Sequence, residues 1–111
     1  MTPTDDPLVG DEVVRVSLET FEVDLRFQRS TLEIGCEFTI VSGSQREKID
    51  PESHTGNIFA LWNLIGTTVQ SVEWDEALSI RFSNGSMIQI PPTPGRQRGA
   101  ILGPGDSYEE F

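Results

Sequence analysis

The feature that most constrains the fold is a hairpin pattern in residues 78–90. Apolar and polar residues alternate over residues 78–83, the dipeptide Asn84-Gly85 follows, and the alternation resumes towards residue 90. Strict alternation is typical of a β-strand with one buried face, and Asn-Gly is a strong signal for a tight turn. The segment therefore predicts two antiparallel strands of one sheet.

The length of the connecting loop decides which side chains face the core. A loop of two residues would put the apolar side chains of the second strand on the opposite face from those of the first. A three-residue loop, residues 83–85, with its glycine left-handed at a bulge, instead places Ile80 opposite Ile88 and Leu78 opposite Ile90. We predict the bulged loop.

Two earlier segments, residues 13–18 and 21–28, show the same alternation. A short loop of residues 19–20 between them would place Arg15 opposite Asp24 on the outer face. Opposite charges directly across a strand pair stabilise it by a few tenths of a kcal/mol, roughly. The charges therefore favour this register.

A second reversal is predicted around residues 29–30. It would bring Leu32 opposite Phe27 in the core and Glu33 opposite Arg26 on the outer face. With two independent charge matches, the pattern predicts a meander of three strands.

Helical signals replace the alternation from residue 50 onwards. Asp50 is a suitable N-cap, Pro51 suits a first helical position, Gly66 suits the far end, and Thr55 offers a later start. Both tryptophans of the chain are predicted to be core residues. The apolar stripe of the helix would comprise Ile58, Leu61, Trp62 and Ile65.

Together these patterns predict an α+β fold, a mainly antiparallel β meander or sandwich-like sheet of about seven strands with one helix packed on it. The remaining strands are expected over residues 37–42 and 68–74. The 111 residues suffice for a single domain. Residues 1–10 are expected to form a loose leader, and the prolines and glycines in residues 92–111 predict an irregular tail.

The charge of the chain restricts its partners. Eighteen acidic against 8 basic residues give a formal net charge of -10. Such a surface repels nucleic acid and anionic membranes over distances that salt does not screen. We therefore expect a basic protein partner, no nucleic acid and no membrane.

Cysteine usage and the terminal segment indicate a cytoplasmic location. The single cysteine, Cys36, cannot form an internal disulfide. The first residues lack the basic and apolar runs of a secretory signal, and no apolar run reaches the length of a membrane span.

Residues suited to catalysis are scarce. The only histidine, His54, lies at the expected helix start, where a solvated or capping role is expected, and acidic neighbours disfavour a reactive thiolate at Cys36. The chain has no phosphate-binding loop and no calcium-loop spacing. We predict no catalytic, cofactor-binding or metal-binding residues. An enzyme built on a carboxylate pair would require a cleft with two close carboxylates, one of them desolvated.

The remaining candidate for a functional site is a charged surface. The outer face of the first meander carries a surplus of acids and is either a solvated sheet face or a docking surface for a basic protein. Acids in the turn after residue 74 and the aromatic C-terminus extend the candidate surface. The candidate partner-binding residues are Glu19, Glu22, Asp24, Glu33, Glu37, Asp75, Glu76, Tyr108, Glu109, Glu110 and Phe111.

The runs 66–69, 75–85 and 88–92, with Tyr-Glu-Glu-Phe at 108–111, resemble a family of small uncharacterised bacterial domains of actinobacterial type. In that family a strand, an Asp-Gly or Asn-Gly turn and a strand ending in Pro-Pro precede a terminal Tyr-Glu-x-aromatic motif. The chain departs from the pattern at residues 76–77, where the family tends to carry a glycine.

The resemblance implies binding rather than catalysis, and no catalytic residues are carried over from it. The family is similar in setting to immunity proteins, which bind and neutralise a toxin encoded nearby. The leading hypothesis is thus a non-enzymatic immunity-type protein whose acidic surface covers the active site of a basic toxin. The alternative is a small structural or assembly subunit that self-associates through a sheet edge.

Overall fold

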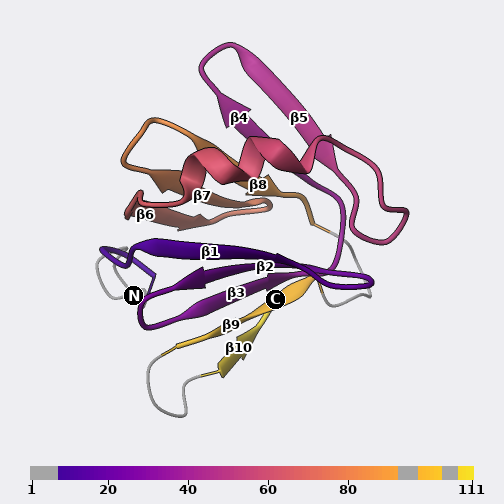
Figure 1. Ribbon diagram of the computed structural model, residues 1–111. Coiled ribbons are helices and arrows are strands. Elements are labelled where there is room, and N and C mark those ends of the chain that lie inside the picture. The colour runs from indigo at the N-terminus through magenta and orange to yellow at the C-terminus, as the bar shows by residue number, and fades with distance from the viewer. Residues whose placement is uncertain (1–7, 93–97, 104–107) are drawn as a thin grey trace.

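The computed structural model describes residues 8–92, 98–103 and 108–111, and consists of two five-stranded antiparallel sheets around one hydrophobic core (Figure 1). Sheet I has the spatial order β1 (Val13–Leu18), β2 (Val23–Phe27), β3 (Thr31–Ile34), β9 (Gly99–Leu102) and β10 (Tyr108–Glu110). Sheet II has the spatial order β5 (Gln45–Ile49), β4 (Phe38–Ser42), β8 (Met87–Ile90), β7 (Leu78–Phe82) and β6 (Val69–Trp74).

The mainly antiparallel β architecture is confirmed, but the predicted number of strands is too low. Ten strands are present in the described ranges instead of about seven. The additional strands, β5, β9 and β10, come from segments that lack a long alternating run, so their pairing partners and not their own patterns make them strands.

Alternating side chains of both sheets form the core. Leu25, Leu32 and Ile101 lie opposite one another on neighbouring strands of sheet I, and Ile80 lies opposite Ile88 in sheet II. All five are almost fully buried. Each such side chain stabilises the fold by about 1.5–3 kcal/mol relative to an exposed one.

The two sheets are joined where β1 begins. Val13 donates a backbone hydrogen bond to the carbonyl of Thr67 (2.9 Å) and accepts one from Gly66 (2.8 Å). Glu12 and Thr68 form an isolated bridge beside them. Past this junction β1 is an edge strand of sheet I.

The prediction for residues 78–90 is confirmed in register and in loop type. Ile80 faces Ile88 and Leu78 faces Ile90. The glycine of the three-residue loop has φ of 88°. The preceding strand, β6, pairs with β7 as expected.

In the first meander, the predicted register is wrong by two residues at both turns. Val16 faces Leu25 instead of Val23, and Leu32 faces Leu25 instead of Phe27. Because two residues are one full period of a strand, the shift leaves the inner and outer faces unchanged. Only the partners across each pair differ. The exception is a bulge in β1 between Val13 and Arg15, where Val13 is buried and Val14 is exposed at 45%.

The shift does overturn the predicted charge pairs on the outer face. Arg15 lies opposite Arg26 instead of Asp24, and Glu33 lies opposite Asp24 instead of Arg26. Like charges directly opposite each other destabilise a strand pair. Other interactions must therefore impose this register.

Two contacts from distant parts of the chain hold the observed turns. The buried carboxylate of Asp11 accepts a hydrogen bond of 3.1 Å from the backbone of Arg29 in the β2–β3 turn. In the β1–β2 turn, the ring of His54 stacks on Phe21 with centroids 6.0 Å apart and contacts the carbonyl of Thr20. The alternation of apolar and polar residues along each strand predicts neither of these contacts.

The predicted helix over residues 50–66 is wrong in type and extent. The described residues contain one helix, the 3₁₀-helix η2 (Ile58–Leu64), which begins after Asn57. The side chain of Asp50 caps only an isolated turn, where it accepts a hydrogen bond from the backbone of Glu52 (3.0 Å). None of the helical structure in the described residues is long and apolar enough to cross a membrane.

The 3₁₀ geometry changes which residues of this segment are buried. With three residues per turn, Leu61 and Leu64 point into the core. Phe59 and Trp62 are instead exposed at 68% and 56%, and Trp74 is exposed at 39%. The prediction that both tryptophans belong to the core is therefore wrong.

The described parts of both terminal segments contain more structure than the composition of these segments predicts. Part of the segment 92–111, predicted to be irregular, forms β9 and β10, because β3 offers a free edge on which β9 pairs. Leu8, within the predicted loose leader, is fully buried. Residues 1–7 of that leader lie outside the described residues.

Gly56 requires a glycine for two reasons, since its φ is 108° and a Cβ atom would meet the carbonyl oxygen of Lys48. We predict that Gly56→Ala lowers the free energy of unfolding by about 3 kcal/mol, measured by urea denaturation. The control Gly43→Ala, at φ 62° with open space around it, should cost about 1 kcal/mol. Equal losses would contradict this assignment.

Candidate functional site

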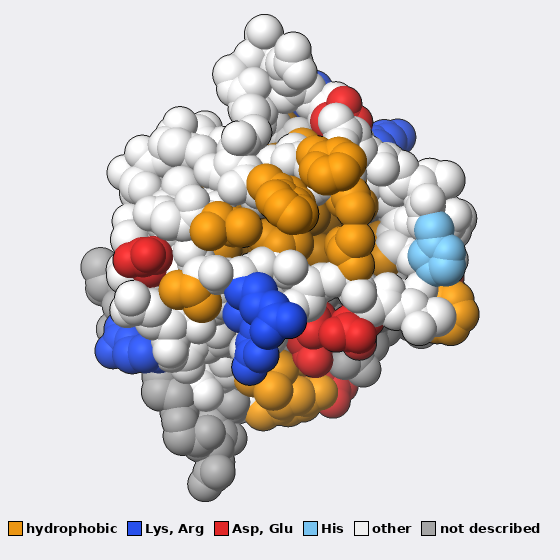
Figure 2. Space-filling model, viewed as in Figure 1, with side chains coloured by type: hydrophobic (Ala, Val, Ile, Leu, Met, Phe, Trp, Pro, Cys, Tyr) orange, Lys and Arg blue, Asp and Glu red, His pale blue; other side chains and the backbone are white. Residues whose placement is uncertain are grey.

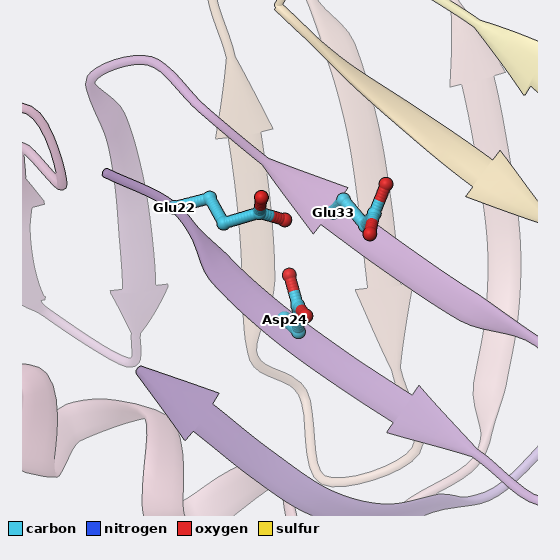
Figure 3. Close-up of side chains that lie close together, drawn as sticks. All are labelled: Glu22, Asp24 and Glu33. Carbon is cyan, nitrogen blue, oxygen red and sulfur yellow. The ribbon is translucent and has the colours of Figure 1, made fainter. Parts of the chain in front are cut away.

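Three carboxylates gather on the outer face of sheet I. One oxygen atom from each of Glu22, Asp24 and Glu33 lies within 4.8 Å of the others. Figure 3 shows the three side chains pointing towards one another from β3 and from the beginning of β2. We refer to these three residues as the acidic cluster.

The pairing of β2 with β3 brings the members of the cluster together. Asp24 faces Glu33 across the β2–β3 pair, and Glu22 precedes Asp24 by two residues, which puts it on the same face. Glu19 in the β1–β2 loop adds a further negative charge near Asp24. Glu110 lies in the same row of the outer face, across β9.

The cluster is poorly stabilised in its charged form. One oxygen of Glu22 and one of Asp24 are shielded from solvent and have no hydrogen-bond donor among the described residues. Burial raises the pKa of Asp24 to about 7, and a hydrogen bond with Glu22 and the charges of Glu22, Glu33 and Glu19 act in the same direction. Burial and the charge of Glu22 also raise the pKa of Glu33. A cation would relieve this repulsion.

The described basic residues do not neutralise the cluster. Arg15 and Arg26 face each other in the adjoining row, and neither forms an ion pair with it. The guanidinium of Arg98 donates hydrogen bonds to the carbonyls of Ile90 (3.3 Å) and Pro91 (3.2 Å). The cluster therefore keeps its surplus of negative charge.

A hollow of about 210 Å³ opens beside the cluster. Two of the acids, Glu22 and Glu33, form part of its wall. Its lining residues are Phe21, Glu22, Glu33, Gly35, Arg98, Gly99 and Ala100.

The carboxylate oxygens of the cluster are hard ligands of the kind that calcium and magnesium prefer. Three such ligands are fewer than either ion takes, so water would have to complete the coordination. Sequence analysis did not bring these acids together, because the assumed register put an arginine, not an aspartate, opposite Glu33.

Comparison with known proteins places the chain in a family. A family model described as a family of unknown function, DUF6188, matches residues 4–108. The chain belongs to the DUF6188 family. Neither the curated proteins nor the solved structures contain a significant match to it.

Several candidate residues of this DUF6188 member lie apart from the cluster. Glu37 forms an ion pair with Lys48 at 3.9 Å, with both side chains largely exposed. Asp75 and Glu76 belong to the β6–β7 turn of sheet II. Glu109, on β10, has its side chain on the opposite face from the cluster.

The C-terminal aromatics have different environments. The ring of Phe111 packs edge-on against Trp74 with centroids 5.8 Å apart, and the guanidinium of Arg98 lies 5.6 Å from its centroid. Phe111 also exchanges backbone hydrogen bonds with Gly99. Phe111 therefore fastens the C-terminus, whereas Tyr108 remains 56% exposed.

The other residues that sequence reasoning singled out are explained by structure. Cys36 is buried, as an unreactive cysteine should be. His54 is exposed and holds the β1–β2 loop through Phe21 and Thr20. Neither belongs to the acidic cluster.

Sequence reasoning missed an exposed apolar surface. Hydrophobic side chains gather over η2, next to the edge of β1 (Figure 2). We refer to this surface as the apolar patch, and its members are Leu18, Phe59, Trp62 and Ile65. The predicted α-helical stripe placed Trp62 and Ile65 in the core. In the tighter 3₁₀-helix Leu61 stays buried as predicted, whereas Trp62 and Ile65 face outwards.

The raised pKa of Asp24 gives a testable dependence of stability on pH. Between the ordinary aspartate pKa of about 3.9 and the folded value of about 7, the folded protein binds more protons than the unfolded chain. The free energy of unfolding therefore falls as pH rises through this range. We predict that Asp24→Asn raises the melting temperature by a few degrees at pH 8 and has little effect at pH 4, measured by thermal circular dichroism.

The exposed turn residue Asp75 provides the control, because Asp75→Asn removes the same charge outside the cluster. Its effect should be small at both pH values. A melting temperature of Asp24→Asn that follows the wild type over the whole range would refute the electrostatic description of the cluster.

Proposed function

We propose that this protein is a non-enzymatic binding module whose acidic cluster docks a basic protein partner. The observation that carries the proposal is the convergence of Glu22, Asp24 and Glu33 without a compensating cation among the described residues. A lysine or arginine side chain of the partner would enter the adjacent hollow and supply the missing charge. Charge-assisted hydrogen bonds of this kind are among the stronger polar contacts in proteins.

The charge of the whole chain supports the same partner class. A net charge of -10 raises the rate at which a basic protein reaches the cluster, and this steering weakens as salt increases. The binding of a basic partner should therefore depend on ionic strength in both rate and affinity.

More specifically, we propose that the chain is an immunity-type protein of the bacterial cytoplasm, which binds and neutralises a cognate toxin. The resemblance of its hairpin and C-terminal motif to immunity-like bacterial domains supports this form. Nuclease toxins present cationic clefts, and an acidic inhibitor competes there with the phosphate backbone of the substrate. A single free, buried cysteine fits a reducing compartment.

One observation favours a second candidate, an enzyme that uses a carboxylate pair. A pKa of about 7 for Asp24 beside Glu22 suits general acid–base catalysis. The hollow at the cluster, about 210 Å³, is smaller than the roughly 300–1,000 Å³ of most small-molecule sites. We therefore favour binding over catalysis.

The proposal is tested by capture from a lysate of the native host, followed by mass spectrometry. The immobilised wild-type chain should retain a basic protein, and the double variant Asp24→Asn, Glu33→Gln should bind the purified partner about tenfold or more weakly, because it removes two negative charges from the contact. Raising the salt concentration should weaken wild-type binding as well.

The matched control removes two negative charges from sheet II instead. The double variant Glu73→Gln, Asp75→Asn should bind the purified partner with nearly wild-type affinity. Capture of no basic protein, or equal weakening by both double variants, would refute the role of the cluster. Inhibition of the partner's own activity by the wild-type chain then distinguishes an immunity protein from a simple binding module.

A further inference from the structure

We propose that a second copy of this chain pairs with the free edge of β1, so that sheet I continues from one copy into the other. This interface uses a different surface from the acidic cluster and does not depend on the proposed function. Three features support it: the unpaired backbone edge of β1, the apolar patch beside it, and the charged residues Arg15 and Glu19 on either side of the strand centre.

Within residues 8–92, 98–103 and 108–111, no strand pairs with the outer edge of β1. β1 is the terminal strand of sheet I, and its contacts with the β6 side end at Val13. The backbone of Glu19 donates a hydrogen bond to the carbonyl of Glu22 (2.9 Å). Hydrogen-bonded positions alternate along an antiparallel pair, so this bond shows that the odd-numbered residues of β1 direct their N–H and C=O groups towards β2. The even-numbered residues Val16 and Leu18 therefore direct their N–H and C=O groups away from β2, towards the free edge.

The space beside this edge is open and partly apolar. A hollow of about 400 Å³ separates β1 from η2, and its lining includes residues 15–19, Ile58 and Trp62. In the apolar patch, Leu18 and Trp62 are exposed at 53% and 56%. Exposed aromatic and aliphatic side chains beside an unpaired strand edge favour the addition of another strand.

The outer edge of sheet II is protected in a way that the β1 edge of sheet I is not. β5, the terminal strand of sheet II, carries Arg46, Glu47 and Lys48 in its centre. Charged side chains on an edge strand oppose pairing with another chain. β1 instead presents the apolar residues Val16 and Leu18.

The sequence of β1 is complementary to itself in one antiparallel register. When two β1 strands pair about a twofold axis at Ser17, Val16 of each copy lies opposite Leu18 of the other, and each such pair exchanges both backbone hydrogen bonds. The same register places Arg15 of each copy opposite Glu19 of the other. Both residues are exposed and line the hollow.

Neighbouring registers lack this complementarity. Only shifts of two residues keep the backbone groups in phase. One such shift puts Arg15 opposite Ser17, and the other puts Ser17 opposite Glu19. The charge match, present twice because of the twofold symmetry, therefore favours a second copy of this chain over an unrelated extended segment.

The proposal is tested by sedimentation equilibrium over micromolar to millimolar concentrations in about 0.15 M salt, where the Debye length of about 8 Å screens the repulsion between two acidic copies. The wild type should form dimers. Arg15→Glu or Glu19→Arg alone should weaken the dimer about tenfold, because each replaces two attractive cross-strand pairs by two repulsive ones. The exchange of both charges in one chain should restore wild-type affinity.

Arg81→Glu is the matched control, since it makes the same charge change at an exposed strand position, but on β7 of sheet II. It should leave the dimer affinity nearly unchanged. Amide hydrogen exchange adds an independent measurement: the amides of Val16 and Leu18 should be protected at concentrations where the dimer forms and exposed where the monomer dominates.

A wild-type chain that stays monomeric over the whole range would overturn the proposal. A dimer that Arg15→Glu leaves intact, or one without protection at Val16 and Leu18, would also overturn it. The wild-type and Arg15→Glu results do not bear on capture of a basic partner, because they leave the acids around Asp24 unchanged. Glu19→Arg is used only for the dimer, since the charge of Glu19 also acts on Asp24.

Discussion

The hydrogen bond from the backbone of Arg29 to the buried carboxylate of Asp11 is the interaction on which the arrangement of sheet I depends. It fixes the β2–β3 turn and, with it, the register that sets Leu25 against Leu32. Since side chains alternate between the two faces of a strand, fixing the inner pair also fixes the outer one. The register that Asp11 holds thus places two acids, Asp24 and Glu33, directly opposite each other.

This coupling explains why the fold tolerates an unfavourable cluster of charges. The buried apolar pairs of sheet I each contribute about 1.5–3 kcal/mol per side chain, whereas repulsion between partly exposed charges is smaller. The core fixes which side chains face outwards, the Asp11 contact fixes the register, and Asp24 responds through its raised pKa. The surplus negative charge that results is what a basic partner would recognise.

The two proposed surfaces use different physical principles and lie on different parts of sheet I. The acidic cluster attracts by charge, so salt should weaken its complexes. The β1 edge attracts through backbone hydrogen bonds and apolar contact, with one charge pair to set the register. Both can operate in one molecule, because β1 pairs through its edge while the cluster faces outwards.

The sequence by itself determined the antiparallel class, the bulged 83–85 loop and the inner faces of the strands, because these depend on local alternation and turn chemistry. Tertiary structure alone decided the partners across each pair in the first meander, since Asp11 and His54 act on its turns from elsewhere in the chain. It also decided the 3₁₀ form of η2 and the strands β9 and β10, where packing and a free sheet edge outweigh weak local preferences. The candidate acids were thus recognisable as a charged face, but their convergence followed from a register that the sequence does not encode locally.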